Sequence, residues 1–261
     1  MSRYLITGAD GGMGRSICRA LTKRGDEVIG LDLKAPAGQS CKFICADLSD
    51  PASVEAAFEA IAGFGELDGV VHAAGLYDLG SLVEMSESEL QRIFAVNLFG
   101  VARVNRLAIP LLGKSARIVI ITSELAPLEP LPFTGVYAVT KAALDKYAFS
   151  LAMELQLLGI SVSVVRPGAV DTGMLPASMR ALDRFIGTTR LYPVNAERFK
   201  RIVAGFEQKT VSPEKLAKTV LRPLSARHPR FVYNLNRNPL LILLSALPRP
   251  LQLFIIRKIL S

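Results

Sequence analysis

Residues 4–14 read Tyr-Leu-Ile-Thr-Gly-Ala-Asp-Gly-Gly-Met-Gly, and an amphipathic segment from Arg15 to Lys23 follows them. An apolar run, a glycine-rich turn and a helix in this order are typical of a dinucleotide-binding unit. The glycines let the backbone approach a pyrophosphate, and the free N–H groups at the helix start bind its charge. The stretch therefore predicts a dinucleotide site. Its predicted contacts are Gly8, Asp10, Gly12, Met13 and Gly14.

A second predicted strand, residues 27–31, is followed directly by an acidic residue, Asp32. A carboxylate at this position accepts hydrogen bonds from both ribose hydroxyls of the adenosine half and repels a 2′-phosphate. Leu33 stands where a phosphate site needs arginine, and Gly11 brings no positive charge into the turn. These residues favour NAD(H) over NADP(H).

Tyr137 and Lys141 are four residues apart in Tyr-Ala-Val-Thr-Lys, so on a helix they share one face. An unperturbed tyrosine has a pKa of ~10, too high for ready proton exchange at neutral pH. A fixed ammonium beside the phenol favours the phenolate and lowers that pKa. The pair is therefore a candidate general acid/base.

Together these residues resemble the short-chain dehydrogenase/reductase family over residues 3–235, and the apolar C-terminal segment resembles its steroid- and retinol-dehydrogenase branch. His72-Ala73-Ala74-Gly75 is similar to the family's Asn-Asn-Ala-Gly, and Asp47-Leu48 to the pair that touches adenine. Pro167-Gly168 and the residues after it resemble the loop that holds the nicotinamide carboxamide. The further cofactor contacts that this implies are Asp47, Leu48, Ala74, Gly75, Pro167, Gly168, Val170 and Thr172.

The resemblance also implies a mechanism. Tyr137 exchanges a proton with the carbonyl or alcohol oxygen, and Ser123 hydrogen-bonds that oxygen near the nicotinamide. Lys141 binds the nicotinamide ribose and depresses the pKa of Tyr137. Asn97 holds a water that links Lys141 to solvent. NAD supplies the hydride chemistry, with Tyr137 and Lys141 also contacting it.

Three features depart from the family pattern. His72 replaces the first Asn of the usual tetrad, and we expect it to be structural rather than catalytic. Ser123 lies fourteen residues before Tyr137, one more than expected, with three prolines between them. Glu124 directly follows Ser123, and we expect it to be a surface loop charge.

The alternation of strand and helix patterns predicts one α/β domain over residues 1–261, a Rossmann-type doubly wound parallel sheet of about seven strands with a helical C-terminal extension. Ligands then lie beyond the carboxyl ends of the strands. The predicted strands are 3–7, 27–32, 42–46, 67–72, 116–122, 160–166 and 230–234. Residues 171–212 break the alternation and are predicted to form a substrate lid. Its candidate pocket-lining residues are Met174, Leu175, Met179, Phe185 and Ile186.

Composition narrows the class of protein. The chain has 261 residues, and 50% of them are hydrophobic, as expected for a folded globule. Three cysteines and two histidines without metal-ligand spacing predict reduced thiols and no metal site. No basic and apolar leader precedes the first strand, so we expect a cytoplasmic protein.

The tail, residues 236–261, carries two apolar stretches separated by Pro248-Arg249-Pro250. After Glu214 the sequence has no acidic residue but nine Lys or Arg, which accounts for the net charge of +8. Neither stretch reaches the ~20 residues needed to span a bilayer. In the interpretation that we favour, the tail packs over the substrate pocket. In the other, it lies peripherally on an anionic inner membrane surface. Nucleic-acid binding is disfavoured because the basic segment is apolar.

We expect an NAD-dependent oxidoreductase that interconverts a secondary alcohol and a ketone on a bulky apolar substrate, such as a hydroxysteroid or lipid alcohol. The alternatives are a reductase of 3-oxoacyl or polyketide carbonyls and a non-catalytic dinucleotide-binding scaffold. Family resemblance also implies a homodimer or homotetramer through helices near 89–112 and 138–158. Leu144, Leu151, Leu155 and Leu158 fit that interface or packing on the sheet.

Overall fold

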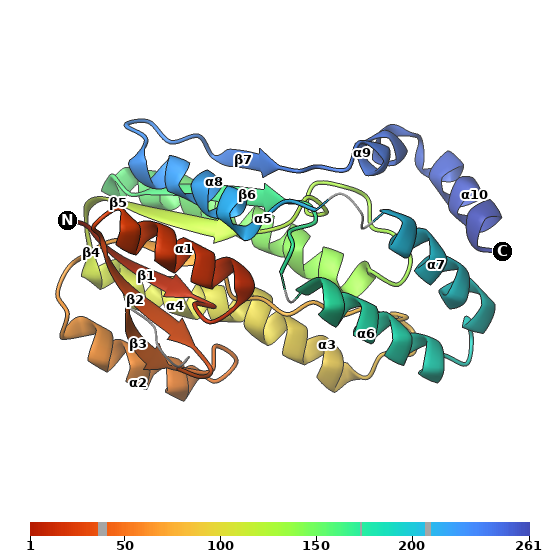
Figure 1. Ribbon diagram of the computed structural model, residues 1–261, viewed down its shortest axis with the longest axis horizontal. Coiled ribbons are helices and arrows are strands. Elements are labelled where there is room, and N and C mark those ends of the chain that lie inside the picture. Colours follow the sequence, from red (N-terminus) through yellow and green to blue (C-terminus); the bar gives the residue numbers. More distant parts are fainter. Residues whose placement is uncertain (36–40, 173, 207–209) are drawn as a thin grey trace.

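Parallel strands form one seven-stranded sheet in the computed structural model, which describes residues 1–35, 41–172, 174–206 and 210–261 (Figure 1). The strands are β1 (Arg3–Thr7), β2 (Glu27–Asp32), β3 (Lys42–Cys45), β4 (Leu67–His72), β5 (Leu112–Ile121), β6 (Ser161–Pro167) and β7 (Val232–Leu235). Their spatial order is β3-β2-β1-β4-β5-β6-β7, and every neighbouring pair is parallel. The predicted parallel sheet is confirmed.

Helices cover both faces of this sheet (Figure 1). They are α1 (Gly12–Lys23), α2 (Pro51–Ala62), α3 (Glu87–Phe94), α4 (Val101–Ala108), α5 (Gly135–Leu155), α6 (Met174–Thr188), α7 (Pro193–Phe206), α8 (Pro213–Ser225), α9 (Pro239–Ala246) and α10 (Arg249–Leu260). Buried residues of α1 and α8 pack on one face, and those of α2, α4 and α5 pack on the other. This double winding follows from apolar strands such as Ile118–Ile121, which are buried on both sides.

The carboxyl ends of the strands point toward one end of the molecule, where α6, α7, α9 and α10 gather (Figure 1). Helices α7 and α10 contact each other there. Asn195 of α7 donates a side-chain hydrogen bond to the carbonyl oxygen of Leu260 over 2.6 Å. Helices α6 and α7 and the C-terminal tail are thus at the edge of the sheet at which a ligand is expected.

The largest difference from the predicted strands is in β5, which begins at Leu112 rather than at residue 116. Leu112 pairs with Leu67, and the register then shifts before Gly69 pairs with Arg117. Between these pairs Ser115 adopts a positive φ of 67°. Because this irregular start has no alternating apolar pattern, sequence periodicity could not detect it.

One helical run, Glu87–Leu111, is long and apolar enough to cross a membrane by length and composition alone. It comprises α3, one π-helical turn (η1, Ala95–Gly100), α4 and a short 3-10 turn. Val101, Val104 and Ala108 on this run are buried in the sheet core. We therefore describe it as a core helix of the domain.

Candidate active site

The turn between β1 and α1 contains glycines at positions where any side chain would clash with neighbouring atoms. Gly8 has a φ of 68°, and a Cβ on it would lie 2.5 Å from the backbone nitrogen of Ala74. A Cβ on Gly14 would collide with the carbonyl oxygen of Gly8. Gly12 faces Thr172, whose Cβ would be 2.9 Å from an added Cβ. Three chain segments therefore meet closely here, as a dinucleotide cradle requires.

A cavity of about 520 Å³ lies beside this turn. Helix α1 starts there at Gly12, and its N-cap residue, Gly11, makes no side-chain hydrogen bond, so the first N–H groups of the helix can bind an anion. The residues present fit a dinucleotide. The predicted cofactor residues that line this cavity are Gly8, Asp10, Gly12, Met13, Gly14, Asp32, Asp47, Leu48, Ala74, Gly75 and Thr172.

The carboxylate of Asp32 is fixed at the end of β2 by two backbone donors. Its Oδ2 accepts a hydrogen bond from the N–H of Asp10 over 2.9 Å, and its Oδ1 accepts one from Leu33 over 2.7 Å. Asp10 in turn pairs with the guanidinium of Arg15 at 2.6 Å. Two carboxylates therefore face this part of the cavity, and the guanidinium of Arg15 is already paired with one of them.

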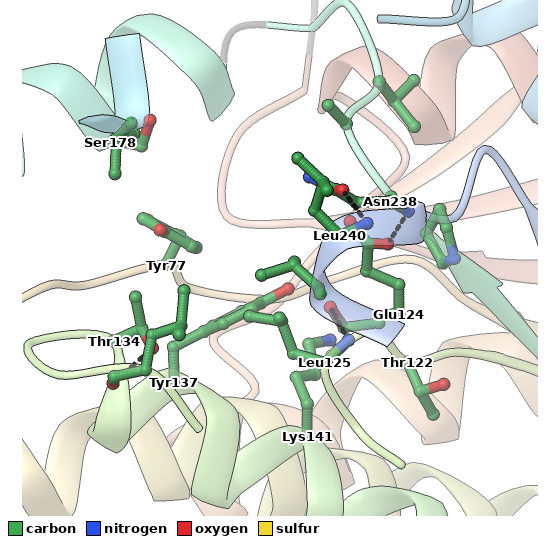
Figure 2. A pocket seen from close by; sticks show the side chains of 18 of the residues that line it. Tyr77, Thr122, Glu124, Leu125, Thr134, Tyr137, Lys141, Ser178, Asn238 and Leu240 are labelled. Carbon is green, nitrogen blue, oxygen red and sulfur yellow. Dashed lines mark hydrogen bonds between the residues drawn. The ribbon is translucent and has the colours of Figure 1, made fainter. Parts of the chain in front are cut away.

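A second cavity, of about 510 Å³, adjoins the first and shares Met13, Ala74 and Thr172 with it. Ser123, Tyr137 and Lys141 line it, as do the remaining predicted cofactor residues, which are Pro167, Gly168 and Val170. Figure 2 shows Tyr137 and Lys141 rising from one helix, α5, into this space. Gly75 and Tyr77 line both cavities and lie beside Lys141 and Tyr137, so the proton-transfer candidates are next to the junction of the two cavities.

The Ser123 hydroxyl lies close enough to the Tyr137 phenol to lower the pKa of that phenol. The Nζ of Lys141 donates to the carbonyl oxygen of Ile121 over 3.1 Å and lies 5.7 Å from the centroid of the Tyr137 ring. All three side chains are buried. The segment between Ser123 and Tyr137 is one residue longer than expected and contains three prolines, but both side chains still line the same cavity.

Burial decides the pKa values of the two ionisable groups. Desolvation raises the pKa of Tyr137 to about 12, although the Ser123 hydrogen bond lowers it, and the negative charge of Glu124 raises it further. Desolvation lowers the pKa of Lys141 to about 8. The expected lowering of the Tyr137 pKa by Lys141 is therefore not observed, since the ammonium points to Ile121 and burial dominates.

Asn97 lies on η1, the π-helical turn between α3 and α4. Its Oδ1 accepts from the N–H of Leu76 over 2.7 Å, and its Nδ2 donates to the Leu76 carbonyl and to Thr140 Oγ1. A Cβ on Gly75 would lie 3.4 Å from Lys141 Nζ and 3.5 Å from Asn97 Oδ1. Asn97 and Lys141 thus both lie beside Gly75, and Asn97 connects the loop after β4 to α5.

His72 is fully buried beneath this loop, consistent with a structural residue. Its Nε2 donates to Asn105 Oδ1 over 2.8 Å, and Asn105 bonds the hydroxyl of Tyr147. Desolvation lowers the pKa of His72 to about 4, so the ring is neutral at pH 7. No group of three or more metal-binding side chains occurs within the part of the chain that the structure describes.

Glu124 is not the surface charge expected from its place in a loop. It is buried, lines the second cavity, and its Oε2 accepts from the backbone N–H of Asn238 over 2.6 Å (Figure 2). Burial raises the pKa of this carboxyl, while the Asn238 N–H and the charge of Arg237 oppose the rise. The prediction was wrong because the tail folds back over this loop.

The tail also lines the second cavity, with residues of both α9 and α10. Two further contacts hold it to the loop after Ser123. The N–H of Glu129 donates to Ser245 Oγ over 3.1 Å, and Arg249 pairs with Glu129 at 3.1 Å. The tail residues that line the cavity are Asn238, Leu240, Leu241, Leu244, Ile255, Ile256, Ile259 and Leu260.

The lid residues chosen from sequence differ from those that line the cavity. Phe185 packs against Phe133, with ring centroids 4.9 Å apart, and Ile186 joins the same cluster. Met179 does not line the cavity, and the side chains of Met174 and Leu175 lie outside the described residues. The apolar spacing of α7 could have identified the residues that were missed. These are Phe199, Ile202 and Val203.

Relatives with similar sequences are oxidoreductases by name. The chain is 34% identical over 189 residues to "Oxidoreductase UcpA" of Escherichia coli, covering 67% of this chain and 72% of that protein. It is 27% identical over 230 residues to "3-ketodihydrosphingosine reductase" of Bacteroides thetaiotaomicron, covering 87% and 85%. It is 34% identical over 184 residues to "3-oxoacyl-[acyl-carrier-protein] reductase FabG" of Salmonella typhimurium, covering 66% and 75%. None of these three names indicates a steroid or retinol dehydrogenase.

Solved structures share the fold. A short chain dehydrogenase family protein from Francisella tularensis superimposes with a TM-score of 0.75 at 22% identity, covering 90% of this chain and 96% of that one. A short chain dehydrogenase from Burkholderia cenocepacia in complex with NADP gives a TM-score of 0.72 at 27% identity, covering 90% and 94%. The family model for short chain dehydrogenases matches residues 3–182. The chain belongs to the short chain dehydrogenase family.

Proposed function

We propose that the protein is an NAD(H)-dependent oxidoreductase that interconverts a secondary alcohol and a ketone on a bulky apolar substrate. One observation carries the proposal. Ser123, Tyr137 and Lys141 meet where a dinucleotide cradle joins an apolar cavity of about 510 Å³. A nicotinamide in the cradle and a carbonyl group in the apolar cavity would meet at this junction. The hydride donor would then be close to the carbonyl carbon, and the acid/base group would be close to the carbonyl oxygen.

In the proposed reduction, the Tyr137 hydroxyl donates its proton to the carbonyl oxygen as that oxygen gains charge. The Ser123 hydroxyl donates a hydrogen bond to the same oxygen and orients it. Bound nicotinamide supplies or accepts the hydride, so a ketone, NADH and one proton give an alcohol and NAD⁺. Lys141, whose pKa is about 8, can return a proton to Tyr137 near neutral pH. Asn97 positions the loop and helix that hold Lys141.

The carboxylates of Asp32 and Asp10 support the preference for NAD(H). A 2′-phosphate at the end of β2 would meet the charge of Asp32, and Arg15, which could offset that charge, is paired with Asp10. Leu33 is exposed beside them and offers no positive charge. The NADP complex of the Burkholderia relative concerns that protein, so the two cofactors must be compared directly for this chain.

The apolar lining supports a lipid-like substrate. Tail residues such as Leu241 and Ile256 and α7 residues such as Ile202 line the same cavity as Ser123, Tyr137 and Lys141. The name of the Bacteroides relative, which matches most of this chain, supports a long-chain ketone or its alcohol. A hydroxysteroid fits the same chemistry. The name of the Salmonella relative favours acyl-chain ketones as a second candidate.

A cofactor and substrate panel tests the proposal. NAD⁺ and NADP⁺ reduction would be followed by nicotinamide absorbance with hydroxysteroids, retinol, long-chain secondary alcohols and 3-hydroxyacyl thioesters. We expect turnover with NAD⁺ and a bulky apolar alcohol. Turnover confined to thioesters would favour the second candidate, and turnover confined to NADP⁺ would overturn the role of Asp32. NADH binding with no turnover on any substrate would favour a non-catalytic scaffold.

We also propose that the protein self-associates through α4 and α5. Leu144 and Leu155 are buried in the sheet core, and Leu151 packs against it, so these three do not supply an interface. Leu158 is exposed. Other apolar residues are exposed on η1 and α5 and support the proposal. These are Phe99, Val139, Phe149 and Met153.

A further inference from the structure

The two tail helices have a second side that the cavity does not use. Their outward apolar residues are large and exposed, at 62% for Leu243, 72% for Leu253 and 57% for Phe254. None of these residues lines the cavity. We call this surface the tail face. It comprises the apolar residues Leu243, Leu251, Leu253 and Phe254 and the basic residues Arg249, Arg257 and Lys258.

Basic side chains surround the apolar part of the tail face. Arg257 and Lys258 are exposed in the last turn of α10, and the ammonium of Lys258 lies 5.9 Å above the Phe254 ring. Arg249 contacts Glu129, yet its side chain remains 80% exposed. The sequence has no acidic residue after Glu214. Apolar side chains rimmed by bases are the pattern of a helix that lies in a lipid–water interface.

The cavity opens beside the tail face. Leu240 and Ile259 line the cavity and are also exposed, at 53% and 49%. They therefore mark a mouth of the cavity at α9 and α10, the helices that carry the tail face. A surface that covers the tail face would lie against this mouth.

We propose that the tail face docks on an anionic lipid bilayer, with the cavity mouth directed toward the acyl chains. An apolar substrate could then pass between bilayer and cavity without crossing water; this last step rests on the proposed function. The charge of the surface selects lipid over a second copy of this chain. A two-fold contact through the tail face would place its own bases against each other.

Vesicle sedimentation with the purified full chain tests the docking without requiring turnover. Vesicles of phosphatidylcholine alone would be compared with vesicles that also contain phosphatidylglycerol. We expect binding to the anionic vesicles only, weakened by salt. Each base at an anionic surface is worth about a fivefold change in partitioning, so Arg257→Glu with Lys258→Glu should lower binding by more than about 25-fold.

Substitution of the exposed apolar residues provides a second test of the docking. Leu253→Ser with Phe254→Ser removes exposed apolar surface without touching the cavity, and it should lower binding at least tenfold while melting temperature stays unchanged. Leu157→Ser is the matched control, since Leu157 is 83% exposed after α5. Equal vesicle binding by all variants, or none by the wild type, would overturn the proposal. The proposal would also be overturned if sedimentation velocity showed a dimer for every protein except the Leu253→Ser/Phe254→Ser variant.

Discussion

Glu124 accepts a hydrogen bond from the backbone N–H of Asn238, 114 residues later in the chain, over 2.6 Å. Asn238 also caps α9, because its side chain accepts from the N–H of Leu240. Glu124 directly follows Ser123, so the first turn of the tail is fixed to the loop that carries a proposed catalytic hydroxyl. The position of the tail and the electrostatics of the site are therefore linked through one carboxylate.

Replacing Glu124 by Gln should separate its charge from its hydrogen bond. The amide oxygen can still accept from Asn238, but the negative charge that raises the pKa of Tyr137 is lost. The pKa of Tyr137 should fall. In alcohol oxidation Tyr137 must lose its proton to act as the base, so the acid-side limb of the pH–rate profile, where the rate rises with pH, should move to lower pH. Glu129→Gln, a more exposed acid in the same loop, is the control. An unchanged profile for Glu124→Gln would refute the electrostatic link.

Glu124→Ala removes the acceptor as well as the charge. It leaves the Asn238 N–H without this partner, which should lower the free energy of unfolding by about 1–3 kcal/mol. Limited proteolysis should then cut the tail near residue 238 faster than in Glu124→Gln. Equal cleavage rates in the two variants would show that the hydrogen bond does not hold the tail.

Asp32→Ala should weaken NAD⁺ binding by roughly 10- to 150-fold, the usual cost of losing hydrogen bonds to a charged group. Adding Leu33→Arg should improve NADP⁺ binding, because the phosphate gains a base and no longer meets the carboxylate. Dissociation constants for both cofactors check this prediction. An Asp32→Ala variant that keeps its NAD⁺ affinity would contradict the proposed ribose contact.

The glycine turn predicts a sharp contrast between two alanine substitutions. Gly14→Ala places a methyl group against the Gly8 carbonyl, so it should abolish NADH binding or unfold the turn. Gly187→Ala, in the exposed part of α6, meets nothing within 4 Å and should stabilise the protein by about 0.5–1 kcal/mol. Thermal unfolding and NADH fluorescence distinguish the two. A Gly14→Ala protein with normal NADH affinity would argue against the cradle.

His72 should make the protein sensitive to acid. Its pKa in the folded state, about 4, lies below the ordinary 6.5, so the unfolded state binds more protons between these values. Stability is therefore full above pH 6.5 and declines by up to ~3 kcal/mol as pH falls to about 4. His72→Asn should remove most of this decline in urea unfolding. His228→Asn, at an exposed histidine, should leave it intact.

The sequence features that predicted the fold and the cofactor cradle are local. Gly8, Gly14 and Asp32 act through short-range backbone geometry and a strand end, and Tyr137 and Lys141 share one helix, so spacing alone placed them. Glu124 could not be placed in this way, since its burial depends on a tail that returns from far along the chain. The pKa of Tyr137 likewise depends on how deeply the assembled cavity excludes water.

In the proposed mechanism Tyr137 exchanges the proton that accompanies hydride transfer. The most direct test compares NADH formation by the wild type and Tyr137→Phe with one apolar secondary alcohol, alongside NADH binding by fluorescence. We predict that kcat falls by about 10²- to 10⁴-fold while NADH binding is retained. Unchanged turnover in Tyr137→Phe would contradict the mechanism.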